Sequence, residues 1–194
     1  MLEREYWCTH GAELRNWGTL QKGIDIWSFI QTSTIKHEGY LLYSALDGFS
    51  RVNKELGRDI GDRILKQVWD NLLETVPKGA FAIRKSGDTF LLLMNVPESV
   101  LKQFVLKHIQ PFYVSEFGFL YRSVGCVRIY PAPNSVDDWL QISMESDIAL
   151  SEAKNRGGNL TVFNDKTDGF KILACGPEAS RKAVTDFERS KYCG

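Results

Sequence analysis

Two groups of side chains in this sequence have residue types that could support chemistry. Cys8, His10 and His37 are metal-ligand types near the N-terminus, but their spacing matches no zinc pattern. We interpret them as separate, incidental side chains. A cluster of aromatic residues could stack on nucleotide bases, although we expect packing in the core and on the sheet instead. The cluster consists of Phe112, Tyr113, Phe117, Phe119 and Tyr121.

A third candidate is the carboxylate of Asp88, which follows Ser86 and Gly87 between two apolar runs. The runs 80–84 and 89–96 are rich in aliphatic and aromatic residues, so they predict a β-hairpin with its turn at Gly87. An aspartate in such a turn can accept hydrogen bonds from its own backbone. This structural role remains open beside a functional one.

The elements that must position these side chains alternate along the chain. Apolar residues recur with helical spacing over 20–37, 50–75, a stretch through Val100, Phe104 and Ile109, and 135–156. A charged helix is expected over 177–190. Strand-like runs cover 40–43, 80–84, 89–96, 118–130 (one long strand or a pair), 160–163 and 169–174, the last as an edge strand. This order predicts an α/β (α+β) sandwich, with a ferredoxin-like, palm-type mixed sheet covered by helices.

Two of the predicted helices carry more specific expectations. Gly57 and Gly61 are expected to divide the helix 50–75 in two. In the helix 135–156 we expect an inward-facing set, followed by a stop at Gly157 and Gly158. That inward-facing set is Leu140, Met144, Ile148 and Ala149.

Composition limits the classes of function. The 194 residues fit one domain with short extensions. The 24 basic and 24 acidic side chains cancel, which argues against a duplex DNA binder. Scattered cysteines without a secretory segment indicate reduced thiols and a cytoplasmic location, and the apolar runs are too short to cross a bilayer. The cysteines are Cys8, Cys126, Cys175 and Cys193.

Four segments, in order and at matching spacing, resemble the GGDEF domain family of bacterial diguanylate cyclases. Residues 46–62 are similar to the family's stretch D-hydrophobic-D-x-F-K-x-(I/V)-N-x-x-x-G-H-x-x-G-D, and residues 84–90 stand in place of the R-(Y/L/W)-G-G-(D/E)-E-F signature. Residues 123–126 are similar to the strand S-(I/V)-G-(V/I). Residues 147–157 resemble A-D-x-A-L-Y-x-A-K-x-x-G-(R/K)-N. The resemblance implies the GGDEF fold for residues 39–164, with an N-terminal helical extension over 1–38 and a C-terminal extension (an edge strand and a helix) over 165–194.

The resemblance implies a metal-dependent active site, because family members join two GTP molecules with carboxylate-bound divalent metals. The first family carboxylate is replaced by Ala45. Asp47 lies two residues on, on the same predicted strand face but roughly 6.6 Å further along. Asp47 and Asp88 are therefore the candidate metal and catalytic residues of a degenerate signature. That signature is Ser86, Gly87, Asp88, Thr89 and Phe90, in which Ser86 replaces a glycine and Thr89 an acid.

The residues that the resemblance implies for nucleotide binding match the family better than those for metal binding do. Asn53 and Asp62 occupy the positions that contact guanine, and Lys154 matches a lysine that reaches the terminal phosphates. Gly158 stands where an arginine usually follows that lysine. The family's inhibitory cyclic-di-GMP site, an R-x-x-D set, is replaced at its key positions by Pro77 and Ala80.

The sequence therefore predicts a degenerate GGDEF domain that acts as a regulatory or interaction module in cyclic-di-GMP signalling, with no synthesis of cyclic-di-GMP. We expect a guanine nucleotide and a protein partner or second copy as ligands, and neither nucleic acid nor membrane. No cofactor is required, although any nucleotide turnover would use Mg²⁺. Two alternatives stay open: a diverged active cyclase that uses Asp47 and Asp88, and a structural partner subunit without nucleotide.

Overall fold

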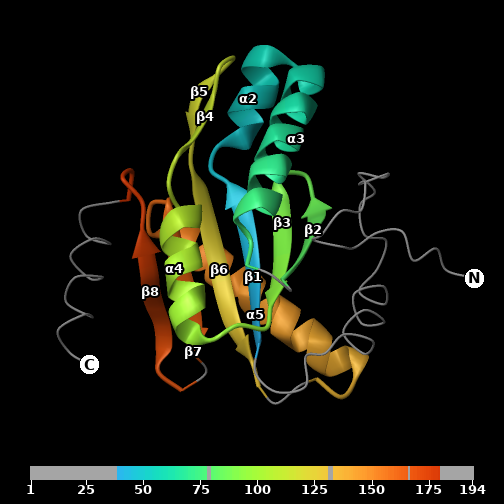
Figure 1. The fold of residues 1–194 in the computed structure, drawn as a ribbon, viewed down its shortest axis with the longest axis vertical. Helices are drawn as coiled ribbons and strands as arrows, with labels where there is room; N and C mark the ends of the chain where they lie inside the picture. Colours follow the sequence, from blue (N-terminus) through green and yellow to red (C-terminus); the bar gives the residue numbers. More distant parts are fainter. Residues whose placement is uncertain (1–38, 78–79, 131–132, 166, 180–194) are drawn as a thin grey trace, which may run out of the picture.

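A computed structural model describes residues 39–77, 80–130, 133–165 and 167–179 (Figure 1). The predicted helix over 20–37 and most of that over 177–190 lie outside these residues, as do Cys8, His10, His37 and Cys193. Cys126 and Cys175 are described, the first buried and the second half-buried.

The centre of the molecule is a six-stranded mixed sheet with the order β2-β3-β1-β6-β7-β8. β1 is antiparallel to both β3 and β6, whereas β6 and β7 run parallel. The predicted mixed sheet, the hairpin and the edge strand are all confirmed. The strands are β1 (Gly39–Leu46), β2 (Phe81–Ser86), β3 (Thr89–Met94), β6 (Arg122–Ile129), β7 (Leu160–Asp165) and β8 (Gly169–Cys175).

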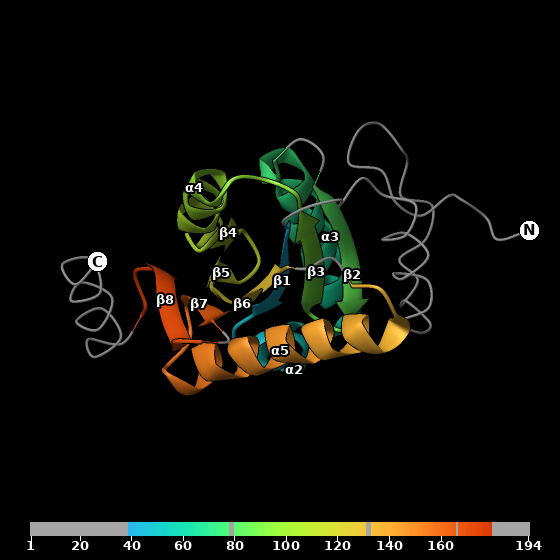
Figure 2. The same cartoon turned by 90° about the horizontal axis from the view of Figure 1, so that it is seen from below.

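Helices cover both faces of this sheet (Figure 2). On one face lie α3 (Arg58–Thr75) and α4 (Glu98–His108), and α5 (Val136–Asn155) crosses the other. The short helix α2 (Phe49–Leu56) precedes α3 and contributes Phe49 and Val52 to the same apolar cluster as α3 and α4. Apolar side chains fill the layer on each side of the sheet. No helix within the described ranges is long and apolar enough to span a bilayer.

The division of the helix 50–75 occurs at Gly57 alone. Gly57 separates α2 from α3 with a φ of 86°, a backbone conformation that glycine adopts without strain. Gly61, the other expected break, lies buried inside α3. Its amide donates to the carbonyl of Gly57 at 3.1 Å, so the helix is continuous through this position. The glycine instead leaves room for a neighbour, because a Cβ at position 61 would lie 2.0 Å from Oδ1 of Asn53.

The segment 112–120 forms a separate two-stranded ribbon of β4 (Phe112–Val114) and β5 (Gly118–Leu120). Only one face of the ribbon meets the core, through Val114 and Leu120. Tyr113 and Phe119 point from the other face and are 62% and 55% exposed. For these two residues the expectation of core packing is wrong, because alternation along a short strand sends them to solvent.

The expected inward face of α5 is wrong for three of its four residues. Ala149 is buried, but Leu140, Met144 and Ile148 are 49%, 51% and 45% exposed. The helix approaches the sheet through small residues, since a Cβ on Gly125 of β6 would lie 2.2 Å from the amide nitrogen of Leu150. The larger apolar side chains at the other positions are thereby turned outward. The buried face consists of Trp139, Ile142, Ser146, Ala149, Leu150 and Ala153.

Candidate functional site

The degenerate signature forms the predicted hairpin between β2 and β3. Its turn is Gly87-Asp88, with Gly87 at a φ of 51°, and Ser86 pairs with Thr89. Arg84 Nε donates to the carbonyl of Gly87 at 2.7 Å. The carbonyl of Asp88 accepts from the amide of Leu46 at 3.3 Å, so the turn lies against the end of β1.

Asp47 is held in place by hydrogen bonds to both of its carboxylate oxygens. Oδ1 accepts from the Ser123 hydroxyl at 2.7 Å, and Oδ2 accepts from the amide of Asn159 at 2.9 Å. Strand β1 ends at Leu46, so the expected sharing of one strand face by Ala45 and Asp47 does not hold. Ala45 is instead fully buried among apolar side chains.

Asp47, Asp88 and Lys154 lie in one electrostatic neighbourhood at this end of the sheet. Partial burial raises the pKa of Asp88 above its ordinary value, and the Asp47 carboxylate adds to the increase. The Lys154 ammonium opposes it. Lys154 itself is exposed on the last turn of α5, so its charge is available to an anionic ligand near the turn.

These residues do not fit a family-type magnesium centre. Hard cations need several oxygen ligands at about 2.1 Å, but Ala45 offers no donor atom and Thr89 replaces a family acid. Across the described ranges, no group of three or more His, Cys, Asp or Glu side chains could hold a metal ion. Metal binding by Asp47 and Asp88 therefore stays a prediction, and the described residues offer no third such side chain to complete the site.

The predicted guanine contacts come from the junction of α2 and α3. Asn53 and Asp62 are both exposed. The Asn53 amide lies over Gly61, the residue before Asp62, and its backbone carbonyl accepts from the amide of Gly57 at 3.1 Å. The bend at Gly57 thus brings the chain around Asn53 next to that around Asp62.

Asn159 is the residue that the sequence reasoning missed, although it occupies the last position of the fourth family motif. It is buried, with a φ of 52°, an unusual value for a residue other than glycine. Its amide donates to Asp47, its Nδ2 to the carbonyl of Ile109 at 3.0 Å, and its Oδ1 accepts from the amide of Glu178 at 3.0 Å. Asn159 therefore joins the candidate site to α4 and to the segment after β8.

Lys85 fastens the signature hairpin to α5. Its Nζ lies 2.6 Å from Oδ2 of Asp147 and 3.8 Å from the centre of the Tyr43 ring. The Tyr43 hydroxyl is hydrogen-bonded to Ser143, and burial raises the pKa of Tyr43 to about 12. Lys85 thus attaches the hairpin to its neighbours through one ion pair, with Asp147, and one cation–π contact, with Tyr43.

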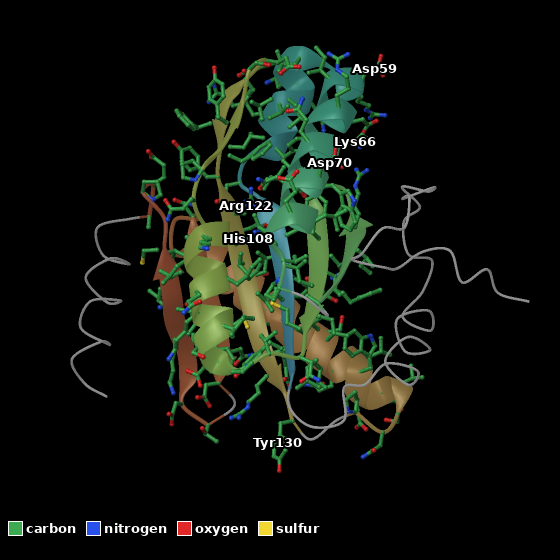
Figure 3. All side chains as sticks on the ribbon, viewed as in Figure 1. Asp59, Lys66, Asp70, His108, Arg122 and Tyr130 are labelled. Atoms are coloured by element: carbon green, nitrogen blue, oxygen red, sulfur yellow. The ribbon has the colours of Figure 1, made fainter. Side chains whose placement is uncertain are left out.

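A second polar cluster is buried in the core and comprises Ser44, His108 and Arg122; Figure 3 labels His108 and Arg122. Arg122 Nη1 lies 3.0 Å from His108 Nδ1, and Ser44 Oγ lies 2.8 Å from Nε2. Because arginine only donates, Nδ1 must accept and the proton must be on Nε2, which donates to Ser44. His108 cannot act as a base toward Ser44 in this arrangement, so the cluster is structural.

Comparison with known families identifies the fold. The family model described as "Diguanylate cyclase, GGDEF domain" matches residues 12–160, well over half of the chain. This chain belongs to the GGDEF family. The match begins ahead of residue 39, and the predicted domain boundaries stay predictions.

Individual GGDEF relatives agree in fold. The "Bifunctional diguanylate cyclase/cyclic di-GMP phosphodiesterase MucR" of Pseudomonas aeruginosa is 30% identical over 125 residues, which are 61% of this chain and 18% of that protein. The active GGEEF domain of a diguanylate cyclase from Vibrio cholerae has a TM-score of 0.59 at 18% identity, over 84% of this chain and 98% of that one. The diguanylate cyclase SiaD, solved with its activator SiaC from Pseudomonas aeruginosa, has a TM-score of 0.59 at 23% identity. The match covers 72% of this chain and 55% of the SiaD chain. The chain thus spans less than a fifth of the MucR sequence it matches.

Proposed function

We propose that this GGDEF domain is a regulatory module of cyclic-di-GMP signalling that binds a guanine nucleotide and does not synthesise cyclic-di-GMP. The observation that carries the proposal is the loss of two family carboxylates, at the positions of Ala45 and Thr89. The remaining Asp47 carboxylate has a structural role, since its two oxygens accept hydrogen bonds from Ser123 and Asn159. Phosphoryl transfer depends on metals that neutralise developing charge, and two of the carboxylates that would hold them are missing.

Base recognition is assigned to Asn53 and Asp62. An amide and a carboxylate together satisfy the guanine edge that carries N1–H and the exocyclic amine. A hydrogen-bonding site rejects a base with mismatched donors far better than an apolar pocket does. We therefore expect GTP to be preferred over ATP.

Phosphate binding depends mainly on Lys154. A single charge-assisted contact is worth about 1.5–3 kcal/mol, and no arginine follows at position 158. Gly158 has a φ of 78°, and a Cβ there would lie 3.1 Å from Oδ2 of Asp47, so the local structure disfavours the family arginine. Affinity for GTP should consequently be in the high micromolar range or weaker, on the order of 5 kcal/mol of binding free energy.

The relatives give the signalling context. MucR carries a bifunctional cyclase and phosphodiesterase name, and SiaD was solved with an activator protein. Both descriptions support a role for this chain within a larger regulatory protein or complex.

The test combines binding and turnover on the full chain. Calorimetry with GTP and with ATP, each with and without magnesium, should show weak binding that prefers GTP and changes little with the metal. Asp62→Ala should abolish the preference for GTP, whereas the matched control Asp88→Ala should leave it almost unchanged. Cyclic-di-GMP should bind no tighter than micromolar, because Pro77 and Ala80 replace the arginine and aspartate of the inhibitory site.

Chromatography of the same mixtures decides between this proposal and its alternatives. No cyclic-di-GMP should accumulate from GTP and magnesium. Steady accumulation that Asp88→Ala abolishes would establish a diverged cyclase instead. Absence of any GTP binding at millimolar concentration would establish a structural subunit without nucleotide.

A further inference from the structure

The turn over residues 176–179, which follows β8, lies against Asn159. A hydrogen bond from the Ala179 amide to the Gly176 carbonyl, at 3.2 Å, closes this turn. The Gly176 amide donates to the backbone carbonyl of Asn159 at 2.9 Å, and the Glu178 amide donates to its side-chain Oδ1 at 3.0 Å. The turn therefore holds both the main chain and the side chain of Asn159.

The contact between the turn and Asn159 is close. Gly176 is buried, and a Cβ there would lie 2.1 Å from Oδ1 and 2.5 Å from Nδ2 of Asn159. The Asn159 amide group is also held from its other side, because Nδ2 donates to the Ile109 carbonyl at 3.0 Å. Pro177 and Glu178, by contrast, are exposed. The turn thus has one side in the core and another that a partner or a neighbouring part of the chain can contact.

Asn159 extends this restraint to the candidate site through its backbone. Its amide donates to Oδ2 of Asp47 at 2.9 Å. The preceding residue, Gly158, lies so near that a Cβ there would be 3.1 Å from the same oxygen. The Gly158 amide donates to the carbonyl of Ala153, the residue before Lys154, at 3.1 Å. One set of contacts therefore holds Asp47 together with the chain that follows Lys154.

We propose that Asn159 is a positioning residue for the phosphate-binding part of the site, and that the turn 176–179 regulates the site by holding or releasing Asn159. The proposal rests on the binding of a guanine nucleotide proposed above. With the turn in place, the Asp47 carboxylate accepts the Asn159 amide and stays directed into the protein. When the turn is displaced, Asp47 loses this donor and the chain after Lys154 loses its anchor.

The charges at the signature hairpin give the direction of the effect. Burial raises the pKa of Asp88, the Lys154 ammonium lowers it, and the Asp47 carboxylate raises it. Both the Lys154 and the Asp47 charges therefore act at the place where a phosphate group would bind. Donors to a carboxylate stabilise its negative charge, so an Asp47 without the Asn159 amide repels an anionic ligand more strongly. Displacement of the turn should weaken nucleotide binding.

Gly176→Ala in the full chain is the direct test, because the new Cβ would displace the Asn159 amide group. Gly176 does not have a positive φ, so alanine fits its backbone. In titrations followed by NMR, the affinities for GTP and ATP should both fall about fivefold, the equivalent of one hydrogen bond. Their ratio should not change, since Asn53 and Asp62 are untouched. An unchanged GTP affinity, or a lost preference for GTP, would overturn the proposal.

Glu178→Ala is the matched control within the same turn. It keeps the backbone amide that donates to Asn159 and removes only the long contact, at 3.5 Å, from the Tyr121 hydroxyl to the Glu178 carboxylate. Both nucleotide affinities should stay at their unmutated values. A fall equal to that of Gly176→Ala would show that the Asn159 contact is not the cause and would overturn the proposal.

A double substitution tests whether the effect passes through Asn159. Asn159→Gly keeps the left-handed backbone, which glycine adopts without strain, and removes the atoms that a Cβ on Gly176 would meet. Alone it should weaken GTP binding as Gly176→Ala does, and this result decides the matter if Gly176→Ala does not fold. Combined with Asn159→Gly, Gly176→Ala should have no further effect. An equal loss in both backgrounds would refute the role of Asn159.

Amide hydrogen exchange without nucleotide separates this inference from the proposed function. In Gly176→Ala the Asn159 amide, which donates to Asp47, should exchange about tenfold faster than in the unmutated protein. Amides of the β2–β3 hairpin should keep their rates. If the unmutated protein binds no nucleotide, the proposed function fails, and the exchange rates still show whether the turn holds the site. Unchanged exchange at Asn159 would overturn the hold of the turn in either case.

Discussion

Acidification should destabilise this protein through His108, which is buried against Arg122 and Ser44. Burial, reinforced by the Arg122 charge, lowers the pKa of His108 well below its ordinary value of 6.5. The folded protein therefore keeps the imidazole neutral, whereas the unfolded chain protonates it near pH 6.5. The stabilisation is fully present above pH 6.5 and is lost as the pH falls toward the folded-state pKa.

The size of the effect follows from proton linkage. Below pH 6.5 the unfolded chain binds one proton that the folded protein excludes, so the free energy of unfolding falls by about 1.4 kcal/mol per pH unit. Over each pH unit between 6.5 and the folded-state pKa, the loss from this single group is therefore about 1.4 kcal/mol. That is a substantial part of the 5–15 kcal/mol by which folded domains are usually stable.

The assay is urea unfolding at several pH values for the unmutated protein and for His108→Gln. Glutamine keeps an acceptor for Arg122 but cannot titrate. The free energy of unfolding of the variant should therefore be lower than that of the unmutated protein at pH 7.5, and it should change less toward pH 5.0. The difference in slope should be about 1.4 kcal/mol per pH unit. Parallel pH profiles for the two proteins would refute the burial of a neutral imidazole at this position.

Two further predictions concern the stability of the fold, and urea unfolding at neutral pH tests each of them. Gly125→Ala should cost about 3 kcal/mol or more, because its Cβ would lie 2.2 Å from the Leu150 amide nitrogen and 2.3 Å from the Ser146 carbonyl oxygen. The control substitution Gly87→Asn, at an open turn position, should cost less than about 1 kcal/mol, and equal losses would contradict the close approach at Gly125. Asp47→Asn should cost about 1.5 kcal/mol, since an amide cannot accept at both of its terminal atoms; an unchanged unfolding midpoint would contradict a structural role for Asp47.

The features that depend on local periodicity were predictable from the sequence. Apolar and aromatic runs on both sides of Ser86-Gly87-Asp88 predicted the hairpin, and the structure confirms it. Gly57 divides the first long helix as expected. Turn chemistry and short-range patterns, which can be read directly from the sequence, determine such elements.

The features that depend on contacts between distant segments were not predictable. The buried face of α5 is set by its close approach to Gly125, so Ile148 turns outward while its neighbour Ala149 turns inward. Hydrophobicity alone favoured the larger residue for the core. The hydrogen bonds of Asp47 come from Ser123 and Asn159, which are far along the chain, and no spacing rule links them.

The strand order has a consequence for synthesis of the chain on the ribosome. β1 pairs with β3 on one edge and with β6, about 80 residues later, on the other. A nascent chain can form the β1–β3 pair early, but the second edge of this entirely buried strand has no partner until residue 129 has emerged. An apolar strand with open hydrogen-bonding groups is a template for unwanted pairing with other chains. Translation speed and chaperone supply across residues 95–129 should therefore control the yield of folded protein more than the same conditions elsewhere in the message.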